Sequence, residues 1–357
     1  MSELLHDSHI IRTWHDITVD ALNTRATDIL IEARSQETVV RTRVDGRLTL
    51  QNQYPIDLHE RLITRIKILA RLDIAEKRLP QDGRLVIGHD FSHPNIDCRV
   101  SILPTLHGEK AVIRILPNRL EELALDHIGL LPEQLEIFKG AIHQSNGLIL
   151  VTGPTGSGKT RTLYSCLSSL NQVHRNICSV EDPIEIRLPG VNQVAYHPKA
   201  GLDFPTIIRA LLRQDPDVIM IGEIRDAASA QLAIQAAQTG HLVLSTLHTR
   251  NALSALCRLK SLGVDQESIE SCLHCVSSQR LVRKLCEQCN TASDRERCQL
   301  CKGAGYFGRI GVHEVLGRQQ LLNCSPHLNL HLAGLQLLNS GLVDQESLDS
   351  ELGTWNS

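Results

Sequence analysis

The residues with the clearest chemical potential form one glycine-rich segment after the apolar run 148–151. The segment fits the pattern G-x-x-x-x-G-K-[ST] and consists of Gly153, Pro154, Thr155, Gly156, Ser157, Gly158, Lys159 and Thr160. Its glycines let the backbone N–H groups converge, and a helix that begins near Lys159 directs the positive end of its dipole to the same place. We expect the loop to bind the β- and γ-phosphates of a nucleoside triphosphate, with Lys159 as a point charge and Thr160 as a Mg²⁺ ligand. A turn without a ligand is the alternative.

Carboxylates that follow two predicted strands are candidates for hydrolytic chemistry. The apolar strand 217–221 leads into Gly222 and Glu223, the form of a Walker B element, and Glu223 would coordinate Mg²⁺ directly or through water. A second strand, 177–181, leads into an acidic cluster of Glu181, Asp182 and Glu185. A carboxylate held near the γ-phosphate could orient the attacking water or accept its proton. For both sets, the alternative is a solvated loop after a core strand.

Two histidines flank the predicted strand 242–247, so we expect His241 and His248 to lie at opposite ends of it. Beside a phosphate site, a histidine could sense the γ-phosphate. A structural role is the alternative for both residues.

Four cysteines form two C-x-x-C knuckles, Cys286 with Cys289 and Cys298 with Cys301, separated by eight residues. Two such knuckles are typical of a tetrahedral Zn²⁺ site with four thiolate ligands. The eight residues between them are fewer than zinc ribbons commonly have, yet they can close one loop, and free thiols are the alternative. A third C-x-x-C pair, Cys272 and Cys275, is predicted to lie in a buried helix rather than to bind metal.

The composition narrows the class of protein. The chain has 357 residues, with 37 basic and 40 acidic side chains and a formal net charge of −3, which argues against a protein that coats nucleic acid. No apolar run approaches the roughly 20 residues of a membrane helix, and no signal-peptide core is visible at the N-terminus. We therefore expect a cytosolic chain whose 11 cysteines are thiols or metal ligands.

Hydrophobic patterning predicts two domains of different class. Residues 1–116 combine an N-terminal helix, a helix at 58–72 and strands at 28–32, 38–44, 47–50, 84–88, 96–103 and 110–116, an α+β domain with an antiparallel sheet. A linker is predicted at 117–132. In 133–317, four strands (148–151, 177–181, 217–221 and 242–247) alternate with helices at 160–171, 205–213, 227–239 and 251–262. This alternation predicts a doubly wound α/β fold with a mainly parallel sheet. A polar tail, helical in part, is expected at 318–357.

Further motifs follow the glycine-rich loop in a fixed order: 180–185, 212–217, 222–226 and 239–249. Together they closely resemble the Walker A, Asp box, Walker B and His box of the ATPases of type II secretion and type IV pilus assembly. The segments 43–46, 79–84, 99–101, 103–105 and 108–110 resemble the second N-terminal domain of that family. The resemblance extends from about residue 26 to residue 316.

The resemblance implies a homo-hexameric ring of RecA-like domains, each preceded by a PAS-like N-terminal domain. Such a ring hydrolyses ATP with Mg²⁺ at the cytoplasmic face of the inner membrane. It would rotate a polytopic membrane platform protein that adds pilin or pseudopilin subunits to a fibre, with other components of the secretion or pilus machinery as further partners. No direct contact with nucleic acid is expected.

The resemblance also assigns roles to residues. Lys159 and Thr160 would hold phosphate and Mg²⁺, Glu223 would be the Walker B acid, and Glu185 would be the general base. His241 and His248 would sense the nucleotide, and three arginines of the N-terminal domain would reach the phosphates: Arg84, Arg99 and Arg114. For each arginine the alternative is a charge on the sheet surface. The tetracysteine module favours assembly over retraction, because retraction motors of the family lack it.

The chain departs from the family pattern in several places. From the family pattern, we expect the first N-terminal domain to be absent or reduced to some two dozen residues, which would leave recruitment by a membrane adaptor in doubt. Arg161, Ala228, Ser229 and Arg250 replace the usual residues near the chemical motifs. The alternatives are therefore a competence-type ATPase for DNA uptake and a nucleotide-binding scaffold with little turnover. A helicase on the same core would need a basic, aromatic-lined channel, and only 3% of the residues are aromatic.

Overall fold

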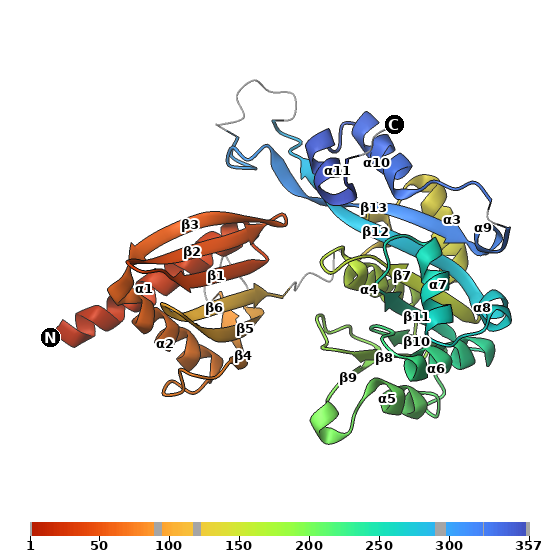
Figure 1. Ribbon diagram of the computed structural model, residues 1–357, viewed down its shortest axis with the longest axis horizontal. Coiled ribbons are helices and arrows are strands. Elements are labelled where there is room, and N and C mark those ends of the chain that lie inside the picture. Colours follow the sequence, from red (N-terminus) through yellow and green to blue (C-terminus); the bar gives the residue numbers. More distant parts are fainter. Residues whose placement is uncertain (1, 89–94, 117–122, 290–297, 324, 355–357) are drawn as a thin grey trace. The chain divides into compact units, whose positions relative to one another are not determined.

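The computed structural model describes residues 2–88, 95–116, 123–289, 298–323 and 325–354. The chain divides into two compact units, Met1–Asn118 and Arg119–Ser357, which differ in their fold (Figure 1). None of the helices among these residues combines the length and the apolar character needed to cross a membrane.

The first unit is built on an antiparallel sheet. Among its described residues, six strands pair in the order β3-β2-β1-β6-β5-β4. The strands are β1 (Asp28–Ala33), β2 (Glu37–Val44), β3 (Arg47–Pro55), β4 (Gln81–Ile87), β5 (Ile96–Thr105) and β6 (Gly108–Ile115). This confirms the predicted antiparallel α+β domain. The tight turn between β2 and β3 places Asp45 and Gly46 at positive φ, as a hairpin requires.

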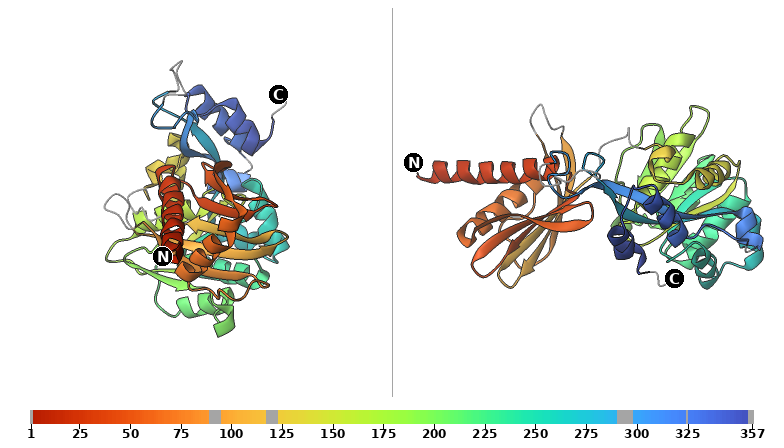
Figure 2. Two further views of the ribbon diagram at one scale, coloured as in Figure 1. Left: turned by 90° about the vertical axis from the view of Figure 1, so that its left-hand side faces the viewer. Right: turned by 90° about the horizontal axis from the view of Figure 1, so that it is seen from above.

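Two helices, α1 (Ser2–Asn23) and α2 (His59–Ala70), cover one face of this sheet. Alternate residues of β1 point to that face, so Ile29 and Ile31 are buried against Ile17 of α1 and Leu62 of α2. The first turns of α1 extend beyond the sheet (Figure 2). The other sheet face therefore carries the remaining alternate positions, which include Asp28 and Arg114.

The second unit is a doubly wound α/β structure. Its described strands pair in the order β13-β12-β7-β11-β10-β8-β9, all parallel except β13, which is antiparallel to β12. The strands are β7 (Gly147–Thr152), β8 (Ile177–Glu181), β9 (Val191–Ala195), β10 (Val218–Ile221), β11 (Leu242–Leu247), β12 (Leu273–Leu285) and β13 (Tyr306–Gly317). The mainly parallel sheet that the alternating pattern predicted is confirmed.

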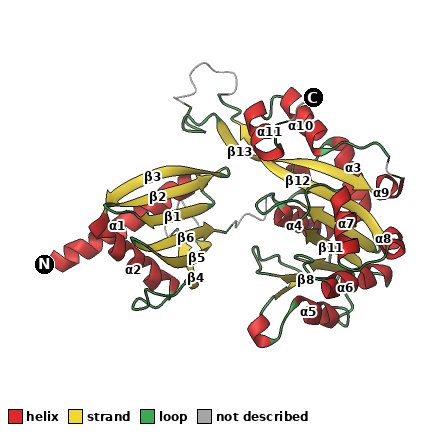
Figure 3. Cartoon of the chain, viewed as in Figure 1, coloured by secondary structure: helices red, strands yellow, loops and turns green. Residues whose placement is uncertain are grey.

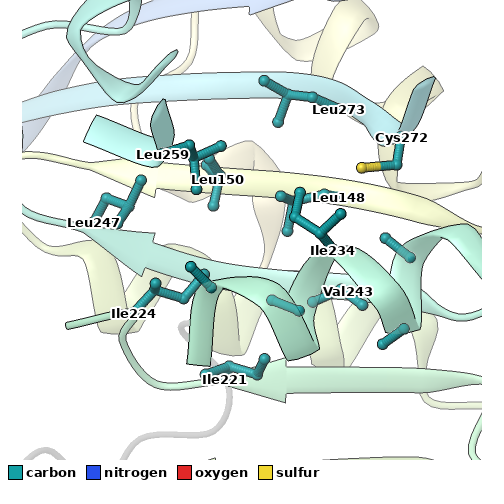
Figure 4. Packing of buried hydrophobic residues seen from close by; sticks show 14 of the residues in the cluster. Leu148, Leu150, Ile221, Ile224, Ile234, Val243, Leu247, Leu259, Cys272 and Leu273 are labelled. Carbon is teal, nitrogen blue, oxygen red and sulfur yellow. The ribbon is translucent and has the colours of Figure 1, made fainter. Parts of the chain in front are cut away.

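Helices cover both faces of this sheet (Figure 3). They are α3 (Pro132–Ile142), α4 (Lys159–Leu170), α5 (Phe204–Leu211), α6 (Ala227–Gln238), α7 (Leu253–Ser261) and α8 (Gln266–Cys272). Leu148 and Leu150 of β7 pack with Ile234 of α6 and Leu259 of α7 (Figure 4). Ile149 and Val151 enter the core on the opposite face, against α3 and α4. The strand is buried on both sides, which explains its unbroken apolar run.

Three features differ from the sequence-based predictions. Cys275 is buried in strand β12, not in a helix, because the apolar residues around it continue the sheet beside β7. Leu123, Leu125 and Ile128 of the predicted linker 117–132 belong to the core of the second unit, because their apolar side chains pack there, and residues 117–122 lie outside the described residues. The tail is helical in part, as expected, with α9 (Arg318–Asn323), α10 (Leu330–Asn339) and α11 (Gln345–Leu352), but it is not simply polar: Leu330, Ala333 and Leu337 of α10 pack in a core cluster with Val282 and Val312.

Candidate active site

The order of the parallel strands gathers the predicted motifs at one edge of the second sheet. The glycine-rich loop follows β7, His248 follows β11, Glu223 follows β10 and Asp182 follows β8. These strands are neighbours in the order β7-β11-β10-β8 and point the same way. The carboxyl edge of such a sheet is where α/β folds bind ligands.

The loop has the backbone conformation that its glycines permit. Gly153, Gly156 and Gly158 have φ angles of 144°, 82° and 90°. A Cβ at Gly153 would lie 2.5 Å from the carbonyl oxygen of Gln279 and 2.6 Å from Ser157 Oγ, so any larger residue would displace the loop. Helix α4 begins directly after the loop, at Lys159. Its free N–H groups and its dipole favour an anion at this point.

Lys159 is held inside the loop. Its side chain is only 9% exposed, and Nζ donates hydrogen bonds of 2.9 Å to the carbonyl oxygens of Gly153 and Pro154. Burial lowers the pKa of Lys159 to about 8; the positive charge of Arg280 acts in the same direction, and Glu223 opposes it. The ammonium is poorly solvated and therefore gains strongly from a polyanionic ligand.

Charged groups of three strand ends converge around Glu223. The side chain of Glu223 is 15% exposed. One of its carboxylate oxygens is ion-paired with Arg225, and the other lies 3.6 Å from Nε2 of His248. Arg225 also lies 3.7 Å from a carboxylate oxygen of Asp182. Burial, with Lys159 nearby, lowers the pKa of His248, so this histidine is neutral at pH 7. The structure thus brings together three of the predicted strand-end residues, Glu223, His248 and Asp182, with Lys159 close enough to act on the pKa of His248.

The residues present fit a triphosphate and Mg²⁺. Among the described residues, Ser157 Oγ and Thr152 Oγ1 are buried at the loop without a hydrogen-bond partner, which is unusual for buried hydroxyls. A ligand with many acceptor oxygens supplies such partners. Thr160 is half-buried in the first turn of α4. Its hydroxyl and the carboxylate of Glu223 are oxygen donors of the kind that Mg²⁺ prefers.

The second acidic cluster separates into two roles. Glu181 is buried and accepts hydrogen bonds from Ser179 Oγ (2.6 Å), from Gln193 Nε2 (2.9 Å) and from the hydroxyl of Tyr164. This carboxylate is therefore structural. Glu185 is exposed, and its backbone N–H donates to the Tyr164 hydroxyl over 3.1 Å. Tyr164 of α4 thus ties the loop that carries Glu185 to the helix that follows the phosphate loop, a role that sequence reasoning missed.

His241 lies away from this edge. It precedes β11, whose first residue pairs with Gly147 at the start of β7, while the phosphate loop follows the end of β7. The strand between the two histidines separates them by roughly 20 Å. Nδ1 of His241 is 3.0 Å from the carbonyl oxygen of Ala236, near the end of α6. The structure does not bring His241 to the phosphate loop of its own unit.

The three predicted arginines lie in one row across the sheet of the first unit. Strand register places Arg84 opposite Arg99, Arg99 opposite Arg114, Arg114 opposite Asp28, and Asp28 opposite Arg43. Arg114 Nε donates to Asp28 over 3.0 Å, and Arg43 Nε lies 3.7 Å from the same carboxylate. Directly opposed residues share a face, so the row lies on the face that the helices leave open. The sequence predicted the residues but not their alignment.

The four cysteines of the two knuckles form one cluster. Their sulfur atoms all lie within 4.8 Å of one another, with 3.7 Å from Cys286 to Cys298 and 3.5 Å from Cys289 to Cys301. A tetrahedral zinc site with Zn–S bonds of about 2.3 Å requires S···S distances of about 3.8 Å. The N–H of Gly305 donates to Cys301 Sγ over 3.3 Å, a hydrogen bond that fixes the orientation of this sulfur. The cluster fits Zn²⁺ and lies where β12 ends and β13 begins (Figure 1).

Solved structures give the fold an independent comparison. The ATPase DotB of Legionella pneumophila superposes with a TM-score of 0.72 at 19% identity, over 95% of both chains. The pilus retraction motor PilT with bound ADP superposes with a TM-score of 0.63 at 25% identity, over 93% of this chain and 94% of PilT.

Sequence relatives are closer. The protein transport protein HofB homolog of Haemophilus influenzae is 46% identical over 97% of this chain and 74% of its own length. The type IV pilus assembly ATPase PilB of Acinetobacter baylyi is 44% identical over 88% of this chain and 58% of its own length. The type II secretion system protein HxcR of Pseudomonas aeruginosa is 46% identical over 86% and 66%. The family model described as type II/IV secretion system protein matches residues 3–328, and the chain therefore belongs to this family.

Proposed function

We propose that this chain is the motor ATPase that powers assembly of a type IV pilus or a type II secretion pseudopilus. One observation carries the proposal: Lys159, Glu223 and His248 meet at one sheet edge beside a loop shaped for phosphate. The relatives named as pilus assembly ATPase and type II secretion protein match at similar identity, 44% and 46%. The identities therefore do not decide between a pilus and a pseudopilus, and the proposal includes both fibres.

Each residue at the edge has a defined task in the hydrolysis of ATP to ADP and phosphate. On binding, Lys159 exchanges its two carbonyl partners for the phosphates, and the loop amides bind the same oxygens. Thr160 and Glu223 hold Mg²⁺, which neutralises charge on the phosphates. Glu185 orients the attacking water and accepts its proton. Neutral His248, beside Glu223, senses whether the γ-phosphate is present. We assign His241 no task at the site of its own chain.

The assembled state belongs to the proposal too. The first unit acts as a PAS-like domain, the second as a RecA-like domain, and six chains form a ring at the cytoplasmic face of the inner membrane. There the ring rotates a polytopic platform protein, together with other components of the machinery. Arg84, Arg99 and Arg114 supply positive charge to the bound phosphates. The row supports this task because it concentrates cations on an open sheet face.

Zn²⁺ in the proposed module has a structural role. Four thiolates without an open position are typical of zinc sites that stabilise a fold. The cluster closes the far end of the β12–β13 pair, which also borders the phosphate loop through Gln279.

Phosphate release from the purified chain tests the proposal. Lys159→Ala and Glu223→Ala should each lower turnover by about a hundredfold or more, because each removes a group that stabilises charge in the transition state. Lys260→Ala, at an exposed position of α7, is the matched control and should retain turnover. Equal turnover in all samples would contradict the assignment. If the wild type bound Mg-ATPγS but released no phosphate from ATP, the result would favour a nucleotide-binding scaffold instead.

A further inference from the structure

Gln279 of strand β12 is a buried side chain that joins the phosphate loop to helix α4. The residue is 2% exposed. Its Nε2 donates to the carbonyl oxygen of Ser157 over 2.7 Å, and its Oε1 accepts from Thr162 Oγ1 over 2.9 Å. Both ends of one amide are thus used, one on the loop and one on the second turn of the helix.

The bond to Ser157 fixes the direction of a neighbouring N–H group. In a planar trans peptide, the C=O and N–H bonds point to opposite sides. Because the Ser157 carbonyl points at Gln279, the N–H of Gly158 in the same peptide unit points away from β12. Gly158 has a φ of 90°, and a Cβ there would lie 3.1 Å from Gln279 Nε2. The Gln279 side chain therefore packs closely against Gly158, on the side opposite to the one that the Gly158 N–H faces.

The backbone of Gln279 also bounds the loop. Its carbonyl oxygen is the atom that a Cβ at Gly153 would meet at 2.5 Å. The next residue, Arg280, donates to this carbonyl oxygen over 2.9 Å and to that of Arg250, in the loop after β11, over 2.8 Å. This short stretch of β12 thus contacts both ends of the phosphate loop and the segment that follows His248.

We propose that Gln279 is a positioning residue for nucleotide binding: it orients the Ser157–Gly158 peptide so that the Gly158 N–H faces the bound phosphates. The inference rests on the proposed assignment of the loop as the phosphate site. Gln279 acts through the loop and needs no contact with nucleotide. Without its amide, the peptide is free to rotate, and part of the ordering cost is then met when nucleotide binds.

A purely structural role would give Gln279 the behaviour of any buried, doubly bonded glutamine, and the chain offers such a case. Gln134 of α3 is 3% exposed, donates to the carbonyl oxygen of His313 over 2.5 Å and accepts from the N–H of Leu131 over 3.1 Å. Its two partners lie outside the phosphate loop. Gln134 is therefore a matched control for burial and hydrogen bonding.

The test compares Gln279→Met with Gln134→Met, since methionine keeps the length and apolar volume and removes both hydrogen bonds. Three quantities are measured for each full-length variant: the Kd for Mg-ATPγS by titration calorimetry, KM and kcat for ATP, and the thermal midpoint without nucleotide. We expect Gln279→Met to raise Kd and KM about tenfold, the worth of one oriented hydrogen bond, with a smaller change in kcat. Both variants should lower the thermal midpoint by similar amounts, because each loses two buried hydrogen bonds. Gln134→Met should leave Kd within about twofold of the wild type. Equal Kd values in the two variants would overturn the inference.

Thr162→Val gives a second test that spares Gln279 itself. Valine keeps the shape of this buried threonine and removes the hydroxyl that donates to Gln279. We expect a smaller rise in Kd, about threefold, and a combined effect with Gln279→Met below the product of the two. The inference would be contradicted if the Kd of the double variant rose by the full product of the two single effects. It would also be contradicted if Thr162→Val left Kd unchanged. Failure of the wild type to bind Mg-ATPγS would instead overturn the proposed function on which it rests.

Discussion

The two units place their positive charges in opposite ways. In the second unit, Lys159 is 9% exposed and bonded to the loop that it serves, and the carboxylate of Glu223 is nearly as buried. In the first unit, the side chain of Arg114 is 66% exposed and lies in a row across an open sheet face. A buried charge in a rigid loop is oriented before a ligand arrives, whereas an exposed arginine such as Arg114, although bonded to Asp28, keeps most of its side chain in solvent. The comparison assigns the main electrostatic contribution to the second unit.

The first prediction tests this ranking directly. Lys159→Met should lower ATP turnover by about a hundredfold or more, because it removes a desolvated charge next to the phosphates. Arg114→Met should lower it by about tenfold or less, because the guanidinium is well solvated and screened. Phosphate release under saturating Mg-ATP measures both. A larger loss at Arg114 would reverse the comparison.

The second prediction concerns the cysteine cluster: the thermal stability of the protein should depend on metal bound there. Chelation should release about one zinc ion per chain and lower the thermal midpoint, since four-thiolate sites bind with free energies on the order of 10 kcal/mol in isolated modules. Cys298→Ser should reduce both the zinc content and the midpoint. Cys257→Ser, at an exposed cysteine outside the cluster, should change neither. A stable protein without metal would refute the site.

The third prediction uses the pKa of Lys159, which burial lowers from 10.5 to about 8 in the nucleotide-free protein. Bound phosphates must raise this pKa, so nucleotide binding at pH 8.5 should take up protons, and the affinity should fall by up to about tenfold per pH unit above 8. Calorimetry in buffers of different ionisation enthalpy measures the uptake, and Lys159→Met should abolish it.

The same shift determines the pH dependence of stability. The unfolded chain keeps the proton of Lys159 to higher pH than the folded one, so this group makes folding stability rise between about pH 8 and 10.5. The wild type should gain stability over Lys159→Met in this window. If neither proton uptake nor this gain were found, Lys159 would be as solvated as the arginines of the first unit.

The smallest predicted effect belongs to the arginine row. Asp28→Asn should destabilise the first unit by about 1 to 2 kcal/mol, because Arg43 and Arg114 lose their shared carboxylate on one sheet face. Asp82→Asn, at an exposed position of β4, is the control and should change stability little. Denaturant unfolding measures both variants, and added salt should reduce the difference. An unchanged Asp28→Asn protein would mean that the row is already screened by solvent.

What could be predicted from the sequence follows from how far apart the contacting residues lie in the chain. The phosphate loop, Glu223 and His248 each adjoin a strand that is mainly apolar, so finding the strands also placed these residues at a common edge. Likewise, the two cysteine knuckles are close in the chain, so their spacing was enough to predict that the four sulfur atoms form one cluster.

Contacts between distant segments could not be predicted in this way. Gln279 meets Ser157 across 122 residues, and nothing in the local pattern of β12 marks it. The arginine row depends on the register of five strands, which periodicity does not determine. The apolar residues around Cys275 suit a helix or a strand equally, and only pairing with β7 decides between them.

Titration of Mg-ATPγS into the full-length wild type and into Lys159→Met, with Lys260→Ala as the control, tests the central claim most directly. The account predicts one binding site per chain in the wild type and in the control, and severe loss of binding in Lys159→Met. Equal binding by all three proteins would show that nucleotide does not bind at this loop and would contradict the account.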